Sequence, residues 1–301
     1  MSGAESQNER EDLWSREPDP FILSLEEERA VAPASSCESI KSDRSMTPPL
    51  SFKGNISYKH DNTKYRVEII PGSPSVYRLK PEEKNIGSIR RLTLGERDPT
   101  KINKTILLVG ETETGKSSLI NALVNYALGV DFEEDVCFQM VQEEEKSQSE
   151  TQTSDVIVYE VFGLEDRTLP FSLTIIDTPG YGHTKGIDKD VLVSERLLDL
   201  FCSTDGVHEI DAVCLVLKGS DCRPSDRLMY VFDSVVSLFG KDIEKNIVAL
   251  VTYSDFFSPH NVLQALKDAK IMCAKDEEGQ PVHFMFNNAQ KRERNKKISL
   301  L

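Results

Sequence analysis

The segment Gly110–Ser117 constrains this chain most, because its sequence Gly-Glu-Thr-Glu-Thr-Gly-Lys-Ser fits the pattern Gly-x4-Gly-Lys-[Ser/Thr]. The apolar, β-prone run Thr105–Val109 precedes it, and apolar residues at helical spacing follow it until Gly129. A strand, a loop with two glycines and a helix N-terminus in this order are typical of a phosphate-binding loop. The sequence therefore predicts a nucleotide site at this loop.

Within this loop each residue type has a predicted role. The backbone N–H groups of residues 112–117 are expected to point at a β-phosphate, and Lys116 to neutralise β- and γ-phosphate oxygens. The hydroxyl of Ser117 is expected to bind Mg²⁺, whereas Ser118 at the helix start is either a further contact or a bystander. The predicted nucleotide-binding residues here are Gly110, Glu111, Thr112, Glu113, Thr114, Gly115, Lys116, Ser117 and Ser118. Lys116 and Ser117 are also predicted to be catalytic, together with Thr153 and Gly180 of the motifs described below.

Composition and charge narrow the class of protein. The 301 residues allow one or two domains, and they contain neither an apolar run of about 18 residues nor an N-terminal secretory signal. We therefore expect a soluble cytoplasmic protein without a transmembrane segment. The six cysteines form no Cys-x-x-Cys pair, so no disulfide framework or zinc site is indicated. A net charge of −14 argues against nucleic acid as a partner.

The chain divides into four predicted segments by composition: a disordered acidic arm (1–53), an extension with short strands (54–101), an α/β nucleotide-binding domain (102–290) and a short basic tail (291–301). The arm is either a linker or carries a short motif for an unknown protein partner at Phe21–Leu25. In the extension, short strands are expected at 65–70 and 76–79, around Pro71-Gly72.

The α/β domain alternates strand and helix patterns. Apolar runs at 156–162 and 171–176 are separated by eight residues, which is short enough to make them an antiparallel hairpin. The remaining expected elements are helix 189–203, strand 210–217, helix 225–239, strand 246–252, a helix beginning at 258 and strand 282–286. This order predicts an α/β fold with a mostly parallel sheet, one antiparallel hairpin and helices on both faces.

A second motif, Asp177-Thr-Pro-Gly180, directly follows the expected strand 171–176. An aspartate at the carboxyl end of a strand beside the phosphate loop is suited to hold Mg²⁺ through water, because carboxylate oxygen is a hard ligand. The backbone N–H of Gly180 is expected to contact a γ-phosphate.

The stretch 130–154 between the first helix and the hairpin is long and polar, which is typical of a mobile or functional loop. Thr153 lies just before the next strand, where its hydroxyl is expected to close on Mg²⁺ when γ-phosphate is present. Thr151 and Ser154 are alternatives for the same role.

Base recognition is predicted at Thr252-x-x-Asp255, after strand 246–252. The carboxylate of Asp255 is placed to accept hydrogen bonds from N1 and the 2-amino group of guanine, which adenine does not offer. The usual companion is a lysine that covers the base, and here Tyr253 takes its place with a ring that can stack. Asn287 and Asn288 either line the base pocket from the other side or form an ordinary turn.

Together these motifs resemble the G domains of the septin-like (paraseptin) branch of translation-factor-class P-loop GTPases, which includes septins, immunity-associated (GIMAP-type) GTPases and chloroplast import receptors. The resemblance covers about 102–290. It implies binding of GTP or GDP with Mg²⁺, slow hydrolysis of the β–γ phosphoanhydride bond, and pairing of G domains into a homo- or hetero-dimer across the nucleotide face.

Two departures from that pattern affect the expected function. Tyr181 follows Asp-Thr-Pro-Gly where Ras-like enzymes have a water-orienting Gln, so hydrolysis is expected to be slow, partner-assisted or absent. Only thirteen residues follow Asn288, which favours a shortened form of such a domain. The leading prediction is a GTP-binding switch with weak GTPase activity. The alternatives are a nucleotide-binding scaffold that does not hydrolyse, and an ATP-using P-loop enzyme, for which Tyr253 is the only support.

Overall fold

The structure is a computed structural model, and it describes residues 66–288 except for 73, 88, 131–133, 135, 142–154, 164–170, 180–187, 222–224, 240 and 255–257. The predicted site residues Thr153, Gly180 and Asp255 therefore lie outside the described residues. The predicted arm 1–53 and basic tail 291–301 lie outside them too.

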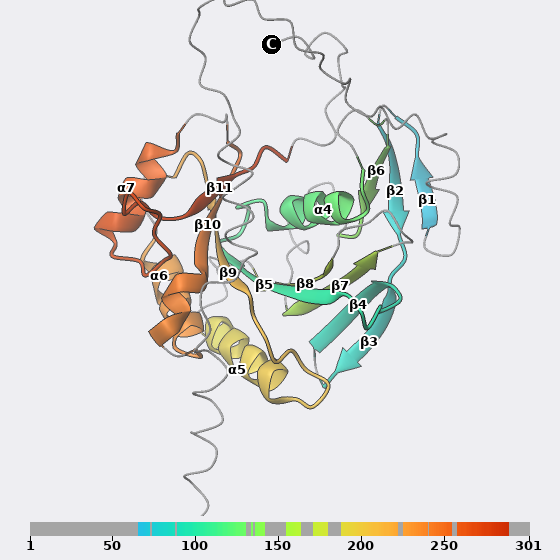
Figure 1. Ribbon diagram of the computed structural model, residues 1–301, viewed down its shortest axis with the longest axis horizontal. Coiled ribbons are helices and arrows are strands. Elements are labelled where there is room, and N and C mark those ends of the chain that lie inside the picture. Colours follow the sequence, from blue (N-terminus) through green and yellow to red (C-terminus); the bar gives the residue numbers. More distant parts are fainter. Residues whose placement is uncertain are drawn as a thin grey trace, which may run out of the picture.

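The main sheet has eight strands within the described residues, in the order β11-β10-β9-β5-β8-β7-β4-β3 (Figure 1). Its strands are β3 (Glu82–Ile86), β4 (Ile89–Gly95), β5 (Ile102–Gly110), β7 (Ile157–Gly163), β8 (Phe171–Asp177), β9 (Ala212–Lys218), β10 (Ile247–Thr252) and β11 (His283–Met285). The pairs β7–β8 and β3–β4 are antiparallel, and the other neighbouring strands are parallel. The predicted mostly parallel sheet with the hairpin of β7 and β8 is thus confirmed.

The second antiparallel pair, β3–β4, was not predicted. It comes from the N-terminal extension, and β4 pairs in parallel with β7, so the extension lengthens the main sheet at its edge. The pattern of β3 gives no strand signal, because four of its five residues are exposed and three are charged. Pairing with the neighbouring strand, rather than burial, accounts for this element.

The start of the extension forms a separate small sheet. Strands β1 (Arg66–Ile70) and β2 (Ser75–Leu79) pair as an antiparallel hairpin at the positions predicted from the sequence, and β2 then pairs in parallel with β6 (Val136–Gln139). All four residues of β6 are buried. The prediction of an uninterrupted polar loop over 130–154 was therefore wrong for this part, and the short apolar run from Val136 to Met140 was the signal that the loop contains a strand.

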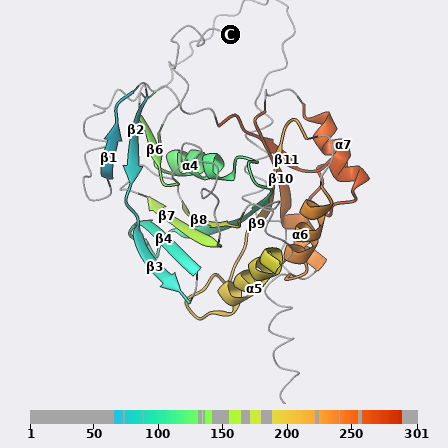
Figure 2. The same cartoon turned by 180° about the vertical axis from the view of Figure 1, so that it is seen from behind.

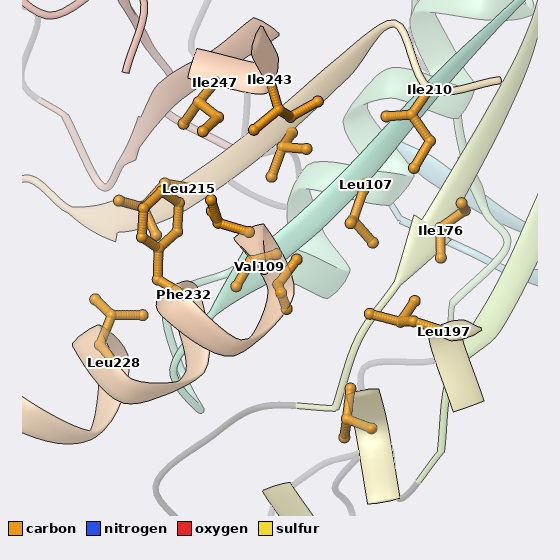
Figure 3. Close-up of a cluster of buried hydrophobic side chains, with 14 of the residues drawn as sticks. Leu107, Val109, Ile176, Leu197, Ile210, Leu215, Leu228, Phe232, Ile243 and Ile247 are labelled. Carbon is orange, nitrogen blue, oxygen red and sulfur yellow. The ribbon is translucent and has the colours of Figure 1, made fainter. Parts of the chain in front are cut away.

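Helices cover both faces of the main sheet, as predicted (Figures 1 and 2). On one face α4 (Lys116–Ala127) packs together with β6. The other face carries α5 (Asp188–Cys202), α6 (Asp226–Val236), a short 3-10 helix (Lys241–Asn246) and α7 (His260–Asp268). Figure 3 shows Leu197 of α5 and Phe232 of α6 directed toward strand residues such as Val109. Burial of these apolar side chains holds the helices on the sheet.

Two asparagines on α4 fasten β6 and the residues after it to this helix. Asn125 donates from Nδ2 to the carbonyl of Phe138 (2.7 Å) and accepts from the N–H of the same residue (2.8 Å). Asn121 donates to the carbonyl of Val141 and accepts from the N–H groups of Met140 and Val141, each at 2.9 Å. The strand that leads into residues 142–154 is thereby held against the helix that follows the phosphate loop.

The topology gathers the predicted motifs at one edge of the sheet. Strand β5 is parallel to β8 and to β9, and β9 is parallel to β10. The carboxyl ends of β5, β8 and β10 therefore lie at the same edge of the sheet. Parallel α/β sheets bind ligands at this edge. No helix among the described residues has the length and apolar composition needed to cross a membrane.

Candidate nucleotide-binding site

The first residue of the predicted phosphate loop, Gly110, ends β5 beside Val216 of β9. A β-carbon on Gly110 would lie 2.7 Å from the carbonyl oxygen of Val216 and 3.0 Å from Oγ1 of Thr114. Real β-carbons do not approach backbone oxygens this closely, so only glycine fits where β5 turns into the loop.

The loop then delivers the N-terminus of α4 without a side-chain cap. Gly115 is the N-cap residue, with a φ of 86°, and as a glycine it supplies no side-chain cap to the amides of the first turn. Glu113 also has a left-handed backbone, with a φ of 63°. An uncapped helix N-terminus offers several N–H donors and the positive end of the helix dipole to an anion. This geometry suits a phosphate group.

Lys116 folds back over the loop. Its ammonium group donates to the carbonyl oxygens of Gly110 (2.7 Å) and Glu111 (2.9 Å), and the residue is buried. Burial lowers the pKa of Lys116 to about 8, and the nearby carboxylates of Asp177 and Glu111 oppose this shift. The lysine is thus a buried cation that neutral carbonyls hold at the predicted phosphate position.

Asp177 lies beside the phosphate loop. It ends β8 next to Leu108 of β5, and the following residue, Thr178, donates from Oγ1 to the Leu108 carbonyl at 2.8 Å. The Asp177 side chain is buried, and its Oδ1 has no hydrogen-bond donor among the described residues. Burial raises the pKa of Asp177 to about 6, and the charge of Lys116 opposes this rise. A buried oxygen without a donor is available to a cation or its bound water.

The end of β10 is attached to the phosphate loop. The hydroxyl of the buried Thr252 lies 2.5 Å from the carbonyl oxygen of Thr114 and 3.0 Å from that of Leu217. Thr114 in turn donates from Oγ1 to the carbonyl of Glu111 at 2.9 Å. The predicted base-recognition strand and the predicted phosphate loop are therefore in direct contact.

The two predicted asparagines follow β11, next to the end of β10. The N–H of Ser254 donates to the carbonyl of Phe286 (3.1 Å), and the N–H of Phe286 donates to that of Val251 (2.8 Å). Asn287 is exposed, whereas the Nδ2 of Asn288 is buried without an acceptor among the described residues. This unsatisfied amide is placed where the sequence predicts one wall of a base pocket.

One contact of the loop was missed by the sequence reasoning. Ser225, the N-cap residue of α6, accepts from the N–H of Leu228 and donates its hydroxyl proton to the Glu111 carboxylate. The sequence predicted a helix beginning at this serine, but the contact joins residues 114 positions apart, which no local pattern reveals. Ser225 therefore fixes a side chain of the phosphate loop as well as the start of α6.

The described residues contain no group of three or more His, Cys, Asp or Glu side chains that would hold a metal by itself. Among the described residues, the predicted metal ligands are the carboxylate of Asp177 and the hydroxyl of Ser117. Mg²⁺ commonly binds through one or two protein oxygens together with substrate phosphates and water. The residues present thus fit a magnesium ion that arrives with a nucleotide.

Comparison with known proteins supports the fold. A model of the AIG1 family matches residues 104–300, which is more than half of the chain. A curated relative, the probable GTP-binding protein EngB of Acholeplasma laidlawii, is 28% identical over 178 residues, covering 59% of this chain and 76% of that protein.

Among solved structures, the chain is similar to Toc33 from Arabidopsis thaliana. A dimerization-deficient mutant of Toc33 is 19% identical, with 65% of this chain and 75% of that chain covered and a TM-score of 0.42. Toc33 in complex with GDP and Mg²⁺ is 18% identical, with 65% and 74% covered and a TM-score of 0.42.

Proposed function

The chain belongs to the AIG1 family, and we propose that it binds GTP and GDP with Mg²⁺, hydrolyses GTP slowly, and acts as a nucleotide-dependent switch or assembly module. One observation carries this proposal: the buried ammonium of Lys116 lies on the carbonyls of Gly110 and Glu111 at the uncapped start of α4, beside the buried carboxylate of Asp177.

The phosphate tail would be held by this chain's amides and by Lys116. The N–H groups of the loop and the first turn of α4 would donate to the phosphate oxygens. Lys116 would exchange its two carbonyl acceptors for β- and γ-phosphate oxygens, which hold the charged form of the lysine better than neutral carbonyls do. The site therefore contains a buried positive charge, the Lys116 ammonium, that a bound phosphate would neutralise.

Mg²⁺, when bound, would neutralise the charge that develops on the β- and γ-phosphate oxygens. Ser117 and Asp177 would hold it, the aspartate through water, and the unpaired Oδ1 of Asp177 supports this assignment. Thr153 is the proposed third oxygen donor, and the backbone N–H of Gly180 the proposed γ-phosphate contact.

Guanine would be selected at the edge formed by β10 and β11. We assign Asp255 to the N1 and 2-amino groups of guanine, and Asn287 and Asn288 to the other wall of the pocket. Support comes from the fixed position of Thr252 against Thr114 and from the unsatisfied Nδ2 of Asn288. An adenine base would leave the Asp255 carboxylate unpaired, which is the physical basis for discrimination.

Hydrolysis in this proposal is slow, because the residues assigned above to the phosphates and Mg²⁺ position the substrate and stabilise its charge, and none of them is assigned as a strong base. Tyr181 stands where a glutamine would orient water in Ras-like enzymes. The same observation favours a second candidate function, a scaffold that binds nucleotide without hydrolysing it.

Isothermal titration with GTP, GDP and ATP in Mg²⁺, together with a phosphate-release assay, tests both functions. We expect GTP and GDP to bind at least tenfold more tightly than ATP, with slow release of phosphate from GTP. Binding without release would favour the scaffold, and binding of ATP alone would contradict the guanine assignment. For the Asp255→Asn variant we expect a preference for xanthosine over guanosine nucleotides, because Asn offers a donor in place of an acceptor.

Assembly and location complete the proposal. We propose that the protein belongs to the septin-like branch, is cytoplasmic, and pairs as a homo- or hetero-dimer through its nucleotide face, with residues 1–53 reserved for a protein partner. Light scattering of the full chain with GDP and with a non-hydrolysable GTP analogue tests the pairing. A mass that stays monomeric with both nucleotides would exclude a nucleotide-dependent homodimer.

A further inference from the structure

Glu111 brings a negative charge into a loop that is otherwise suited to hold phosphate. Its carbonyl accepts from the Lys116 ammonium and from the Thr114 hydroxyl, each at 2.9 Å. The side chain of the same residue ends in a carboxylate, and a carboxylate forms charge-assisted hydrogen bonds with an ammonium group just as a phosphate does. A carboxylate that is free to move at this position would therefore compete with phosphate for Lys116.

Ser225 binds that carboxylate from a different element. As the N-cap residue of α6, it accepts from the N–H of Leu228 at 3.0 Å, and its hydroxyl donates to the Glu111 carboxylate. A hydroxyl has one donor and two acceptor positions, so both bonds can form at once. The N-terminus of a helix is also the end that favours a negative charge. The carboxylate thus has a suitable partner other than Lys116.

The bond places the carboxylate at the start of α6, which packs on the face of the sheet opposite α4 (Figures 1 and 2). The Lys116 ammonium is instead held by the two loop carbonyls at the start of α4. Burial lowers the pKa of Lys116, and the Asp177 and Glu111 carboxylates oppose this shift, so the Glu111 charge acts on the lysine even where it is held. A carboxylate released from Ser225 could approach the lysine further.

We propose that Ser225 is a positioning residue of the phosphate loop: by binding the Glu111 carboxylate at the start of α6, it keeps this carboxylate from pairing with Lys116 and leaves the ammonium to the phosphates. This inference rests on the proposed function and adds a residue outside the loop that controls its affinity. Ser225 acts through Glu111 and touches no part of the nucleotide in this proposal. The bond also fixes the loop before the ligand arrives, which reduces the ordering that binding requires.

Ser225→Asp separates the two roles of this serine. Aspartate is as good an N-cap as serine, so thermal unfolding should stay within about 4 °C of the wild type. The new carboxylate cannot donate to Glu111 and repels it. In isothermal titration with GTP and Mg²⁺ we expect an affinity roughly tenfold lower, the factor that corresponds to losing a modest hydrogen bond to a charged group. Ser225→Thr keeps the hydroxyl and the cap, and should bind GTP within about twofold of the wild type.

A double-mutant cycle shows whether Ser225 acts through Glu111. Glu111→Gln removes the competing charge and should raise GTP affinity, because an amide forms no ion pair with Lys116. In this background Ser225→Asp should change GTP affinity by less than about twofold, since the glutamine amide can donate to the new carboxylate. Asp226→Asn is the matched control: it removes an exposed carboxylate from the first turn of α6, next to Ser225 in the chain, and should leave GTP affinity within about twofold of the wild type.

The outcomes distinguish the inference from the proposed function. If the wild-type chain binds neither GTP nor GDP, the proposed function fails and the inference falls with it. If the wild type binds GTP and Ser225→Asp binds it equally well, only the role of Ser225 is rejected. A loss that persists in the Glu111→Gln background would also reject it, because Ser225 would then act without the carboxylate. An equally large change in Asp226→Asn would mean that charge at the start of α6, rather than this bond, sets the affinity.

Discussion

The hydroxyl of Thr252 lies 2.5 Å from the carbonyl oxygen of Thr114, so the end of β10 and the phosphate loop are joined by a buried hydrogen bond. The same hydroxyl lies 3.0 Å from the carbonyl of Leu217. One side chain therefore fixes the relative position of the loop, β9 and β10. Sequence reasoning assigned Thr252 to base recognition, and the structure adds this contact with the phosphate loop.

Replacing Thr252 by the isosteric valine should weaken nucleotide binding while keeping the packing volume. The Thr114 carbonyl would lose its buried donor, at a cost of about 1–3 kcal/mol, and the loop would be less well positioned for phosphate. GTP titration should show an affinity roughly 5- to 50-fold lower. Thr252→Ser retains the hydroxyl and serves as the control; equal GTP affinity in Thr252→Val and Thr252→Ser would show that the bond does not position the loop.

Lys116→Ala should abolish GTP binding, since the variant removes the only side-chain cation that the described loop places among its own carbonyls. Lys104→Ala is a matched control, because Lys104 lies near the other end of β5 and pairs with Asp211 at 3.1 Å. That variant should lower thermal stability and leave GTP affinity unchanged. Retained binding in Lys116→Ala would contradict the assignment of the phosphate site.

Local patterns were enough to place the phosphate loop, the strand before Asp177 and the β7–β8 hairpin, because each is encoded within a short segment. Burial supplied the signal, because residues 105–110 of β5, 172–177 of β8 and all of β10 are buried and these segments are largely apolar. The alternation of strands and helices along the chain also indicated a mostly parallel sheet, but it did not predict the order of the strands within that sheet.

Contacts between distant segments were not predictable in the same way. The sequence of the exposed strand β3 gives no strand signal, and the apolar run of β6 does not show that this strand pairs with β2 and packs on α4. The contact between Ser225 and Glu111, and the left-handed backbone of Tyr253, likewise depend on tertiary neighbours. The roles of Thr153, Gly180 and Asp255 remain predictions from the sequence.

Asp177→Asn should stabilise the chain in the absence of nucleotide and Mg²⁺ while weakening Mg²⁺-dependent GTP binding. Burial raises the pKa of this carboxyl from 3.8 to about 6, so the folded state holds the proton more tightly than the unfolded chain. Burying the Asp177 carboxyl therefore causes no loss of folding stability below pH 3.8. The loss grows between pH 3.8 and about pH 6, and it stays constant above that pH. In thermal unfolding, the free energy of unfolding of Asp177→Asn should exceed that of the wild type by about 1–3 kcal/mol at pH 7 and by little at pH 3.5.

The opposite result, a less stable Asp177→Asn at pH 7, would mean that attraction between Asp177 and Lys116 outweighs the cost of burying the carboxylate. Titrating GTP with and without Mg²⁺ supplies the second measurement. Wild-type affinity should depend on Mg²⁺ more strongly than the affinity of the variant.

Asn125→Leu tests how far the small sheet depends on α4. Leucine keeps a similar volume, but the buried N–H and C=O groups of Phe138 would lose their partners on Asn125, so we expect a loss of about 2–4 kcal/mol in the free energy of unfolding by urea. Gln264→Ala removes an exposed polar side chain from α7, whose partner is Asp268, and should change stability by less than about 0.5 kcal/mol. If Asn125→Leu is as stable as Gln264→Ala, the two bonds of Asn125 contribute little, and β6 is held by its pairing with β2 and by the other contacts of α4, such as the bonds of Asn121. If Asn125→Leu is destabilised and also loses GTP affinity, the bonds between α4 and β6 help to hold the phosphate loop in the position that binds nucleotide.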